Sequence, residues 1–453
     1  MSTTLARPRP SLLLLAYLAF VSLGLPDGLL GVGWPSIRGD FDVPTEAVGW
    51  VLTAGTVGYL TSSVLAGFTL ARVGVGALLA GSTLLASLAL TGYSVSPVLA
   101  VLVGCALLLG LGSGAVDSGL NAYAAGAFGP RHMNWLHAFF GLGVAIGPLI
   151  MTGVLSTGLS WRWGYGVIAA AQLVLAAAFA LTVRAWHRGV PASTEPDATA
   201  PTEADVGVQA TIAATAAGPA PTIRVPARDT LRLPAVWSGT LAFVLYVAIE
   251  VSAGLWAFLL LTEGRGLGPA LAGGCVSAYW GSLFVGRVVQ GVVAERLGSG
   301  MVLRASLAGM ALGAALIAVP GPAVLAVLGL VVVGFAAAPV FPLLTLTTAE
   351  RVGAAHADRA IGLQIGAAGV GAALVPAGLG VLIGNTSVQV LGSALLALAL
   401  ALIVLYEWGA RRPTAGPSAP VAPAQTGNEG PTPGQPGSDP QTSGPVRPVV
   451  DGR

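Results

Sequence analysis

Apolar runs long enough to cross a lipid bilayer recur along most of this 453-residue chain. A membrane-spanning α-helix needs about 20 consecutive apolar residues, because each residue advances the helix by about 1.5 Å. The runs are unbroken, as in Val98–Leu111, whereas the strands of a membrane barrel alternate in polarity from residue to residue. The sequence therefore predicts an all-α membrane protein.

The composition agrees with this fold class and excludes a water-soluble enzyme. Hydrophobic residues make up 55% of the chain and charged residues only 9%, against about a quarter charged in an ordinary soluble domain. A net charge of +2 gives no electrostatic reason to bind nucleic acid. Cys105 and Cys275 lie inside apolar runs, which is typical of packing residues rather than of a disulfide or a metal site. We expect no metal, no cofactor and no catalytic residue.

Twelve spans are predicted, six before and six after a segment rich in Ala, Pro and Thr. They cover about residues 11–35, 47–69, 76–94, 98–126, 134–157, 163–184, 234–261, 270–292, 300–319, 323–348, 360–383 and 387–408. The first run follows two arginines, as the apolar part of a signal peptide would. Because equally apolar runs recur to residue 408, we expect it to be an uncleaved first helix.

The spans divide the chain into an N-terminal segment (1–10), a six-helix bundle (11–185), a disordered linker (186–232), a second six-helix bundle (233–408) and a disordered Pro-rich tail (409–453). With the N-terminus inside, only Arg38, Arg162 and Arg265 lie outside the cell, and Arg287 lies within a span. Because arginines concentrate on the cytoplasmic side, both termini are predicted to be cytoplasmic. We expect a multi-pass protein of the cell (inner) membrane, by default a monomer.

The two halves resemble copies of one unit. One constant shift along the chain places three small residues on three others: Gly49 on Gly273, Ala54 on Ala278 and Gly67 on Gly291. A slightly longer shift places Gly141, Gly143 and Pro148 on Gly369, Gly371 and Pro376. Duplicated six-helix halves around a central site are a recurring design of transporters.

Only three of the 19 acidic residues fall well inside predicted spans: Asp27, Asp117 and Glu250. An acid at the bilayer centre costs about 2.5–3.5 kcal/mol, so it needs an interior partner, a water-filled cavity or a proton. Asp27 lies within Gly24–Gly28, where Gly and Pro favour a kinked or broken helix that exposes polar groups. Glu250 has Tyr246 one turn before it. Both carboxyls are candidates for function, or for structural hydrogen bonds between helices.

Polar residues of the fourth and fifth spans form a second group of candidates. Asp117 and Asn121 are four residues apart, hence on one helix face, where they could bind a polyol, relay a proton or only bond a neighbouring backbone. His137 is the only histidine within a predicted span. Because histidine titrates near neutrality, His137 would suit proton transfer beside Asp117. The alternative is that it is a solvent-exposed residue at the end of its helix, without a role in transport.

Three further residues have open interpretations. Arg287 could neutralise a carboxylate or bind an anion, but an arginine this close to the cytoplasm more often reaches to the interface or closes a gate. Trp256 lies six residues beyond Glu250 and is either a platform for a ligand or part of an interfacial belt. Gln364 is expected to hydrogen-bond the substrate.

The segment Gly291–Gly298 contains Glu295 and Arg296 and resembles the signature loop of the major facilitator superfamily. Its counterpart Gly67–Gly74 keeps the frame but has Ala71 where the acid belongs. Together with the six-plus-six layout, the resemblance covers about residues 11–408. It implies twelve transmembrane helices in two six-helix pseudo-symmetric bundles. It also implies a cytoplasmic gate, which we assign to Arg72, Arg287, Glu295 and Arg296.

Within this superfamily, Gly24–Gly28, Asp117–Asn121 and Asn134–His137 resemble the fucose–proton symporter branch. In that branch an acid on the first helix and another on the fourth serve sugar binding and proton coupling, and by position these are Asp27 and Asp117. His137 stands where the branch has a glutamine, so the identity of the sugar does not carry over.

We therefore expect a secondary active transporter, in which protons and a small neutral polar solute such as a sugar move together by alternating access. Proton coupling is assigned to Asp27, Asp117, His137 and Glu250, and substrate binding to Asp27, Asn121, Trp256 and Gln364. The rival hypotheses are proton-antiport efflux of amphiphilic compounds and a non-transporting membrane receptor or scaffold. An enzyme is least supported, because no paired catalytic groups have a recognisable spacing.

Overall fold

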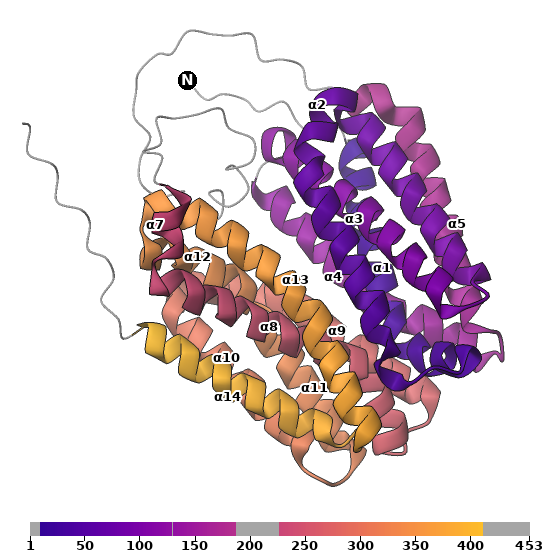
Figure 1. The fold of residues 1–453 in the computed structure, drawn as a ribbon, viewed down its shortest axis with the longest axis vertical. Helices are drawn as coiled ribbons and strands as arrows, with labels where there is room; N and C mark the ends of the chain where they lie inside the picture. The colour runs from indigo at the N-terminus through magenta and orange to yellow at the C-terminus, as the bar shows by residue number, and fades with distance from the viewer. Residues whose placement is uncertain (1–9, 129, 187–225, 411–453) are drawn as a thin grey trace, which may run out of the picture. The chain divides into compact units, whose positions relative to one another are not determined.

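The structure is a computed structural model that describes residues 10–128, 130–186 and 226–410. Within these ranges the regular structure is helical and includes no strand (Figure 1). All of these residues belong to one compact unit, Met1–Ala415, whereas the second unit, Gly416–Arg453, lies outside the described residues. Most of the expected N-terminal segment, linker and tail lie outside them as well.

The first half contains five long helices: α1 (Pro10–Phe41), α2 (Val48–Val95), α3 (Leu99–Ala127), α4 (Pro130–Ser156) and α5 (Trp161–Thr182). Short 3-10 turns, Thr45–Ala47 and Val183–Trp186, precede α2 and follow α5. The 48 residues of α2 would measure about 72 Å, more than twice the thickness of a bilayer core. The helix bends at Gly74, whose φ of 77° suits a residue without a Cβ. Its two arms therefore correspond to two of the predicted spans.

The second half begins with α7 (Ala227–Leu231), a short helix in the last part of the segment predicted as linker. The long helices follow: α8 (Pro234–Leu259), α9 (Pro269–Leu297), α10 (Ser299–Ala318), α11 (Ala323–Ala337), α12 (Val340–Val352), α13 (Ala354–Asn385) and α14 (Val390–Ala410). A π-helical turn, Leu260–Gly264, continues α8. Pro339 separates α11 from α12, because proline has no N–H to donate to the helix. These two helices make up one predicted span.

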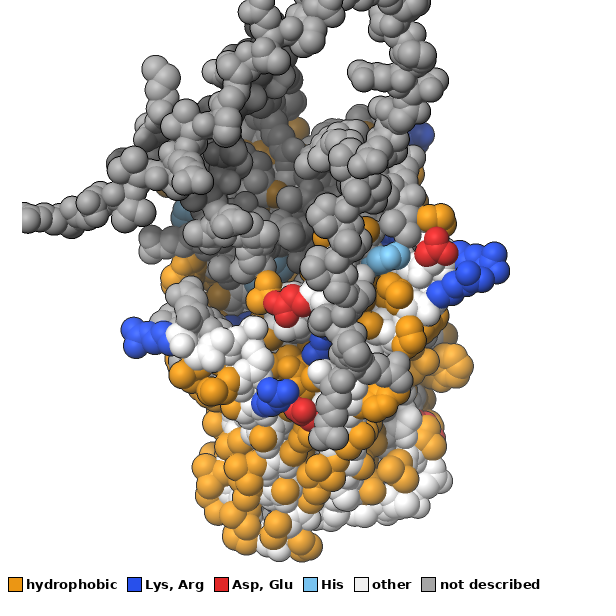
Figure 2. Space-filling view, turned by 90° about the vertical axis from the view of Figure 1, so that its left-hand side faces the viewer, with side chains coloured by type: hydrophobic (Ala, Val, Ile, Leu, Met, Phe, Trp, Pro, Cys, Tyr) orange, Lys and Arg blue, Asp and Glu red, His pale blue; other side chains and the backbone are white. Residues whose placement is uncertain are grey.

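Ten helices of the described residues are long and apolar enough to cross a membrane. The two arms of α2 count once among them, and α9, of 29 residues, is not among the ten but covers one more predicted span, so the helices are consistent with twelve spans. In Figure 2 hydrophobic side chains are abundant in the lower part of the face shown, and the charged side chains lie above them, at about mid-height of the view. A belt of apolar surface with charge toward one end is what a bilayer requires.

Successive membrane-spanning segments run in opposite directions and define two ends of the described unit. We call the end where α1 passes into α2 the Arg38 end, and the end where α2 bends at Gly74 the Arg72 end. Gly298, which the predicted repeat pairs with Gly74, ends α9 at the Arg72 end with a similar φ of 81°. The repeat predicted from the sequence is therefore reproduced in the backbone conformation.

The two halves contact each other through related pairs of helices, α2 with α13 and α4 with α9. Each contact includes a glycine: Gly49 meets Ala377, and Gly273 meets Thr152. Gly49 and Gly273 are equivalent in the repeat, and Ala377 and Thr152 lie on the equivalent helices α13 and α4. The interface between the halves thus follows the pseudo-two-fold symmetry of the fold.

The hydrophobic cores show where the halves are joined. The largest cluster includes residues of both halves, and the first half contributes to it only from 29–51, 90–106 and 151–169, toward the Arg38 end. At the Arg72 end the first half has a separate cluster that contains Phe20 and Phe179, and the second half has one that contains Val236 and Val352. The halves therefore share a core at the Arg38 end and have separate cores at the Arg72 end.

Candidate functional site

Each of the three intramembrane acids points away from the lipid. Leu18, Leu108 and Leu241 are 47%, 41% and 48% exposed, which marks the lipid-facing sides of α1, α3 and α8. Each acid follows such a leucine by nine residues: Asp27 follows Leu18, Asp117 follows Leu108 and Glu250 follows Leu241. Nine residues rotate a helix by about two and a half turns, so each acid lies on the opposite face. The three carboxyls therefore face the protein interior.

Asp27 is exposed although its neighbours on the same face of α1 are packed. Phe20 and Trp34, two turns before and after it, are each 1% exposed. Gly31 lies directly against the α8 backbone at Leu255. Because this stripe of α1 is covered on both sides of Asp27, the exposed carboxyl opens toward the space between the helices and not toward lipid.

The tyrosines of other helices that lie within electrostatic range of the Asp27 carboxyl include Tyr59 of α2 and Tyr165 of α5. The Tyr165 hydroxyl is buried and has no hydrogen-bond partner among the described atoms. A buried polar group of this kind normally has a partner, so this hydroxyl is available to a bound molecule. Sequence reasoning missed both residues, because an aromatic residue within a span is usually a packing residue.

Glycines bring α4 against α1 at the level of Asp27. A Cβ on Gly24 would overlap the carbonyl oxygen of Phe140, and a Cβ on Gly28 would overlap that of Val144. The helix α1 runs without interruption through Pro26, so the broken helix considered from the sequence does not occur. The glycines instead allow close approach of two helices, as small residues commonly do in membranes.

Asp117 is held by hydrogen bonds from two helices. The Tyr59 hydroxyl donates to Oδ2 of Asp117 at 2.6 Å, and Nδ2 of Asn121 donates to Oδ1 at 3.0 Å. The pairing of Asp117 with Asn121 agrees with their predicted position on one helix face. The side-chain oxygen Oδ1 of Asn121 is buried without a partner among the described residues, so it can accept a hydrogen bond from a ligand.

His137 connects the two halves. Its ring packs edge-on against Phe20, with ring centroids 5.4 Å apart. It interacts electrostatically with Asp117 of the first half and with Arg287 of the second. Consistent with this, Nη1 of Arg287 lies 3.9 Å from the point that a Cβ on Gly141, one turn after His137, would occupy. The guanidinium thus reaches the α4 surface from α9.

Glu250 forms the part of the site that belongs to the second half. Its Oε1 lies 3.9 Å from Nη2 of Arg287, with side-chain exposures of 14% and 27%. The Tyr246 hydroxyl donates to its other carboxylate oxygen. The Tyr279 hydroxyl donates to the Glu250 backbone carbonyl at 2.7 Å. Glu250 therefore has both a cation and a hydroxyl as partners. We call the eight residues of this region the central cluster: Asp27, Tyr59, Asp117, Asn121, His137, Tyr246, Glu250 and Arg287.

Two of the residues expected to bind substrate are enclosed by protein in this conformation. Trp256 is 1% exposed, and its indole donates to the carbonyl of Pro376 at 3.1 Å. Gln364 is also 1% exposed and accepts a hydrogen bond from Thr348 at 2.9 Å. Among the described residues, no three His, Cys, Asp or Glu side chains are grouped so that they could hold a metal ion.

The residues expected to form a cytoplasmic gate lie in different environments. Arg72 and Arg296 are exposed at the Arg72 end. Arg287 instead belongs to the central cluster through its contact with Glu250. The Glu295 side chain lies outside those that the structure describes.

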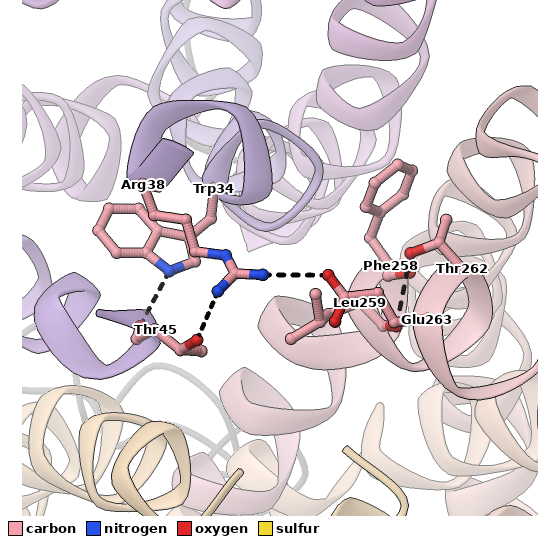
Figure 3. Close-up of polar contacts among 7 residues, drawn as sticks. All are labelled: Trp34, Arg38, Thr45, Phe258, Leu259, Thr262 and Glu263. Carbon is pink, nitrogen blue, oxygen red and sulfur yellow. Dashed lines mark hydrogen bonds and ion pairs between the residues drawn. The ribbon is translucent and has the colours of Figure 1, made fainter. Parts of the chain in front are cut away.

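Polar contacts join the halves at the Arg38 end (Figure 3). Arg38 of α1 donates to Oγ1 of Thr45 at 2.9 Å and to Oε1 of Glu263 at 3.0 Å, and the Trp34 indole donates to the Thr45 carbonyl at 2.9 Å. Glu263 lies in the π-helical turn after α8, a type of turn frequent at functional sites. Sequence reasoning assigned Arg38 to the outer side but no partner, because Glu263 is far away along the chain.

Comparison with known proteins gives a consistent result. The sequence matches the Major Facilitator Superfamily over residues 16–376. A curated relative, the 3-(3-hydroxy-phenyl)propionate transporter of Escherichia coli (strain K12), is 28% identical over 159 residues, which are 34% of this chain and 40% of the relative. The match thus spans less than half the length of that relative.

Solved structures with a similar fold include a mutant of the nucleoside transporter NupG, with a TM-score of 0.67 and 15% identity over 88% of this chain and 100% of the other. Unmutated NupG gives a TM-score of 0.65 at 14% identity, over 89% and 99% of the two chains. The Major Facilitator Superfamily transporter FucP, in the outward conformation, gives 0.54 at 14% identity, over 89% and 99%. At these identities the similarity concerns the fold.

Proposed function

Because the chain belongs to the major facilitator superfamily of transporters, we propose that it couples proton movement to the transport of a small neutral polar solute by alternating access. The observation that carries this proposal is the inward orientation of Asp27, Asp117 and Glu250 between two joined halves. The cost of a carboxylate in the membrane is avoided where it is hydrated, paired or protonated.

The charge balance of the central cluster supports coupling to protons. It contains three carboxylates and one arginine, which gives a formal charge of −2 with His137 neutral. Within the described residues Asp27 and Asp117 form no ion pair, whereas Glu250 pairs with Arg287. A cluster of this charge disfavours an anion. A neutral solute that arrives with protons, or a cation, would balance it.

We assign proton coupling to Asp27, Asp117, His137 and Glu250. Substrate binding is assigned to Asp27 and Asn121, with the unpaired Asn121 oxygen as an acceptor for a solute hydroxyl. Protonation of Asp27 together with solute binding would remove a charge and satisfy its hydrogen bonds, which lowers the cost of moving the site from one side to the other. Trp256 and Gln364 would contact solute only after a rearrangement of the second half, because both are enclosed here.

The two ends of the molecule support alternating access. The halves share a core and the Arg38–Glu263 ion pair at one end, and have separate cores at the other. We assign the Arg72 end and both termini to the cytoplasmic side of the inner membrane, and the concentration of arginines at that end supports this orientation. The structure then corresponds to a state closed to the outside. Closure of the opposite end would bring the signature-loop residues Arg72, Glu295 and Arg296 together.

A second candidate function is efflux of amphiphilic cations in exchange for protons. It is favoured by one specific observation, the uncompensated negative charge of Asp27 and Asp117. A cation would displace protons from these carboxylates instead of arriving with them, so protons and substrate would move in opposite directions.

Transport by the full-length protein in proteoliposomes with an internal pH-sensitive dye tests the proposal. The panel contains a hexose, a nucleoside, 3-(3-hydroxyphenyl)propionate and a cationic dye. We expect a neutral solute to carry protons inward with wild type, and no solute to do so with Asp27→Asn. Asp42→Asn, the same change at an exposed end of α1 where the positive φ of 51° suits Asn, is the control.

Proton movement in the direction opposite to a cationic dye would support the second candidate instead. If no solute of the panel moves protons, or if Asp27→Asn couples like wild type, proton symport through Asp27 is wrong.

A further inference from the structure

A lipid-facing groove runs between α8 and α14, which pack side by side. Two adjoining cavities of about 460 and 470 Å³ form it, and they share Leu241, Leu405 and Trp408. On α8 the lining residues recur every three to four positions, as Trp237, Leu241 and Leu245 do, so they form one stripe along the helix. The groove is therefore an open, mostly apolar depression on the outer surface and is distinct from the central cluster.

The length of the groove along α8 is close to the thickness of one leaflet of the bilayer core. Its α8 wall extends from Pro234 to Leu245, which is about 16 Å along a helix, against about 15 Å for half of the hydrocarbon core. Trp237 and Trp408 lie toward its Arg72 end and are 53% and 49% exposed. Tryptophan concentrates at the level of lipid headgroups. The dimensions thus suit an acyl chain whose headgroup lies at the Arg72 end.

Positive charge lies where that headgroup would be. Arg232 lines the groove at its Arg72 end. Nη1 of Arg351 and Oγ of Ser238, which also lines the groove, are 3.6 and 3.8 Å from the point that a Cβ on Gly409 would occupy. The nearby carboxylate of Glu407 pairs with Arg304 at 2.7 Å. Arg232 therefore lies at the mouth of the groove, and Arg351, whose guanidinium also lies over the Tyr406 ring at 4.8 Å, lies beside it.

We propose that this groove binds an anionic glycerophospholipid, with one acyl chain between α8 and α14 and the phosphate near Arg232 and Arg351. The apolar stripe contributes affinity for any lipid chain. The arginines add a preference for a headgroup with net negative charge, as basic pockets between transmembrane helices do. Neither part of this argument depends on the proposed transport activity.

Lipid retention by the full-length purified protein tests the preference. Native mass spectrometry follows phosphatidylglycerol and phosphatidylcholine with identical acyl chains, added to the protein in detergent. Wild type should retain phosphatidylglycerol at least about fivefold better, and Arg232→Gln should lower that retention by about fivefold while phosphatidylcholine is unchanged. The control is Arg72→Gln, another exposed arginine at the same end but on α2, which should change neither.

A second variant tests the groove itself. Ala401 lines it, and Ala401→Trp should fill it and lower the retention of both lipids, whereas Arg232→Gln affects one. Equal retention of the two lipids by wild type would overturn the proposal. So would an Ala401→Trp protein that retains both lipids normally, including the case in which another segment of this chain already covers the groove. The arginine variant keeps the test decisive if Ala401→Trp fails to fold.

Discussion

The carboxylates of the central cluster have different partners in the two halves of the molecule. In the second half Glu250 has a cation, Arg287, at 3.9 Å and a hydrogen bond from Tyr246. In the first half Asp117 has a hydroxyl and an amide as partners, and neither Asp27 nor Asp117 forms an ion pair within the described residues. One duplicated scaffold thus carries a neutralised acid on one side and uncompensated acids on the other.

This difference indicates that the carboxylates of the two halves have different roles in proton exchange. A carboxylate with a nearby arginine can remain ionised inside the membrane at modest cost, whereas an uncompensated one has to take up a proton or a cation. We therefore expect most of the proton exchange in the first half, at Asp27 and Asp117, and a smaller contribution from Glu250, whose charge Arg287 balances.

The largest expected effect is the loss of coupling on Asp27→Asn. Asparagine keeps the size of the side chain but cannot exchange a proton, so we expect solute-driven proton uptake to fall at least about 100-fold. The double variant Glu250→Gln with Arg287→Gln removes both charges of the neutral pair, and we expect it to retain measurable coupling. Dye-loaded proteoliposomes report both. Equal losses in the two proteins would remove the distinction between the halves.

The next effect concerns the stability of the pair in the second half. Glu250→Gln leaves Arg287 without its counter-ion, and we expect a loss of about 3 kcal/mol in the free energy of unfolding. Adding Arg287→Gln should restore most of it, because no unpaired charge remains. Denaturation of the purified proteins in detergent measures this cycle. Additive losses from the two changes would mean that the groups contribute independently.

A smaller effect is expected for Tyr59→Phe, which removes the hydroxyl that bonds Asp117 at 2.6 Å. Loss of a hydrogen bond to a charged group is worth roughly 1.5 kcal/mol, so we expect initial transport rates to fall about tenfold. Tyr17→Phe is a matched control, since its hydroxyl bonds His132 at 2.7 Å outside the cluster. Similar rates for the two variants would contradict the assignment of Tyr59 to the site.

The smallest effect is expected at the Arg38 end, where the ion pair of Arg38 and Glu263 is partly exposed. Exposed pairs contribute at most about 1 kcal/mol, so Arg38→Gln should shift the ratio of closed to open molecules by up to about fivefold. Spin labels at positions 42 and 268, one in each half, would report this ratio as distances. If Glu263→Gln in the Arg38→Gln background shifts the ratio further, the two residues act separately.

Much of the fold was predictable from local sequence. The length and continuity of the apolar runs specify helices and their approximate ends, because a segment in lipid has to satisfy its own backbone hydrogen bonds. The repeat between the halves, seen first in small residues, reappears in the conformations of Gly74 and Gly298. The resemblance to the major facilitator superfamily is confirmed by the match over residues 16–376.

The site was predictable only in part. An acidic residue within a membrane span has a high free-energy cost, so such residues are rare and can be recognised from sequence. This is why Asp27, Asp117 and Glu250 could be selected. Tyr59 and Tyr165 carry no such signal, because an aromatic ring suits a packed helix equally well. The role of Gly24 and Gly28 was also ambiguous, since glycine serves both broken helices and close helix contacts, and only the position of α4 decides between them.

The sequence by itself determined the class of the protein, its duplicated helices and the acids that the membrane makes expensive, since these follow from the chemistry of single residues and short segments. Tertiary structure decided the partners: Tyr59 with Asp117, Arg287 with Glu250 and Arg38 with Glu263, the last pair from opposite halves of the chain. Such pairs depend on how helices pack and on which faces meet. That information is spread over the whole chain, so no local pattern reveals which charge is neutralised and which remains to be balanced.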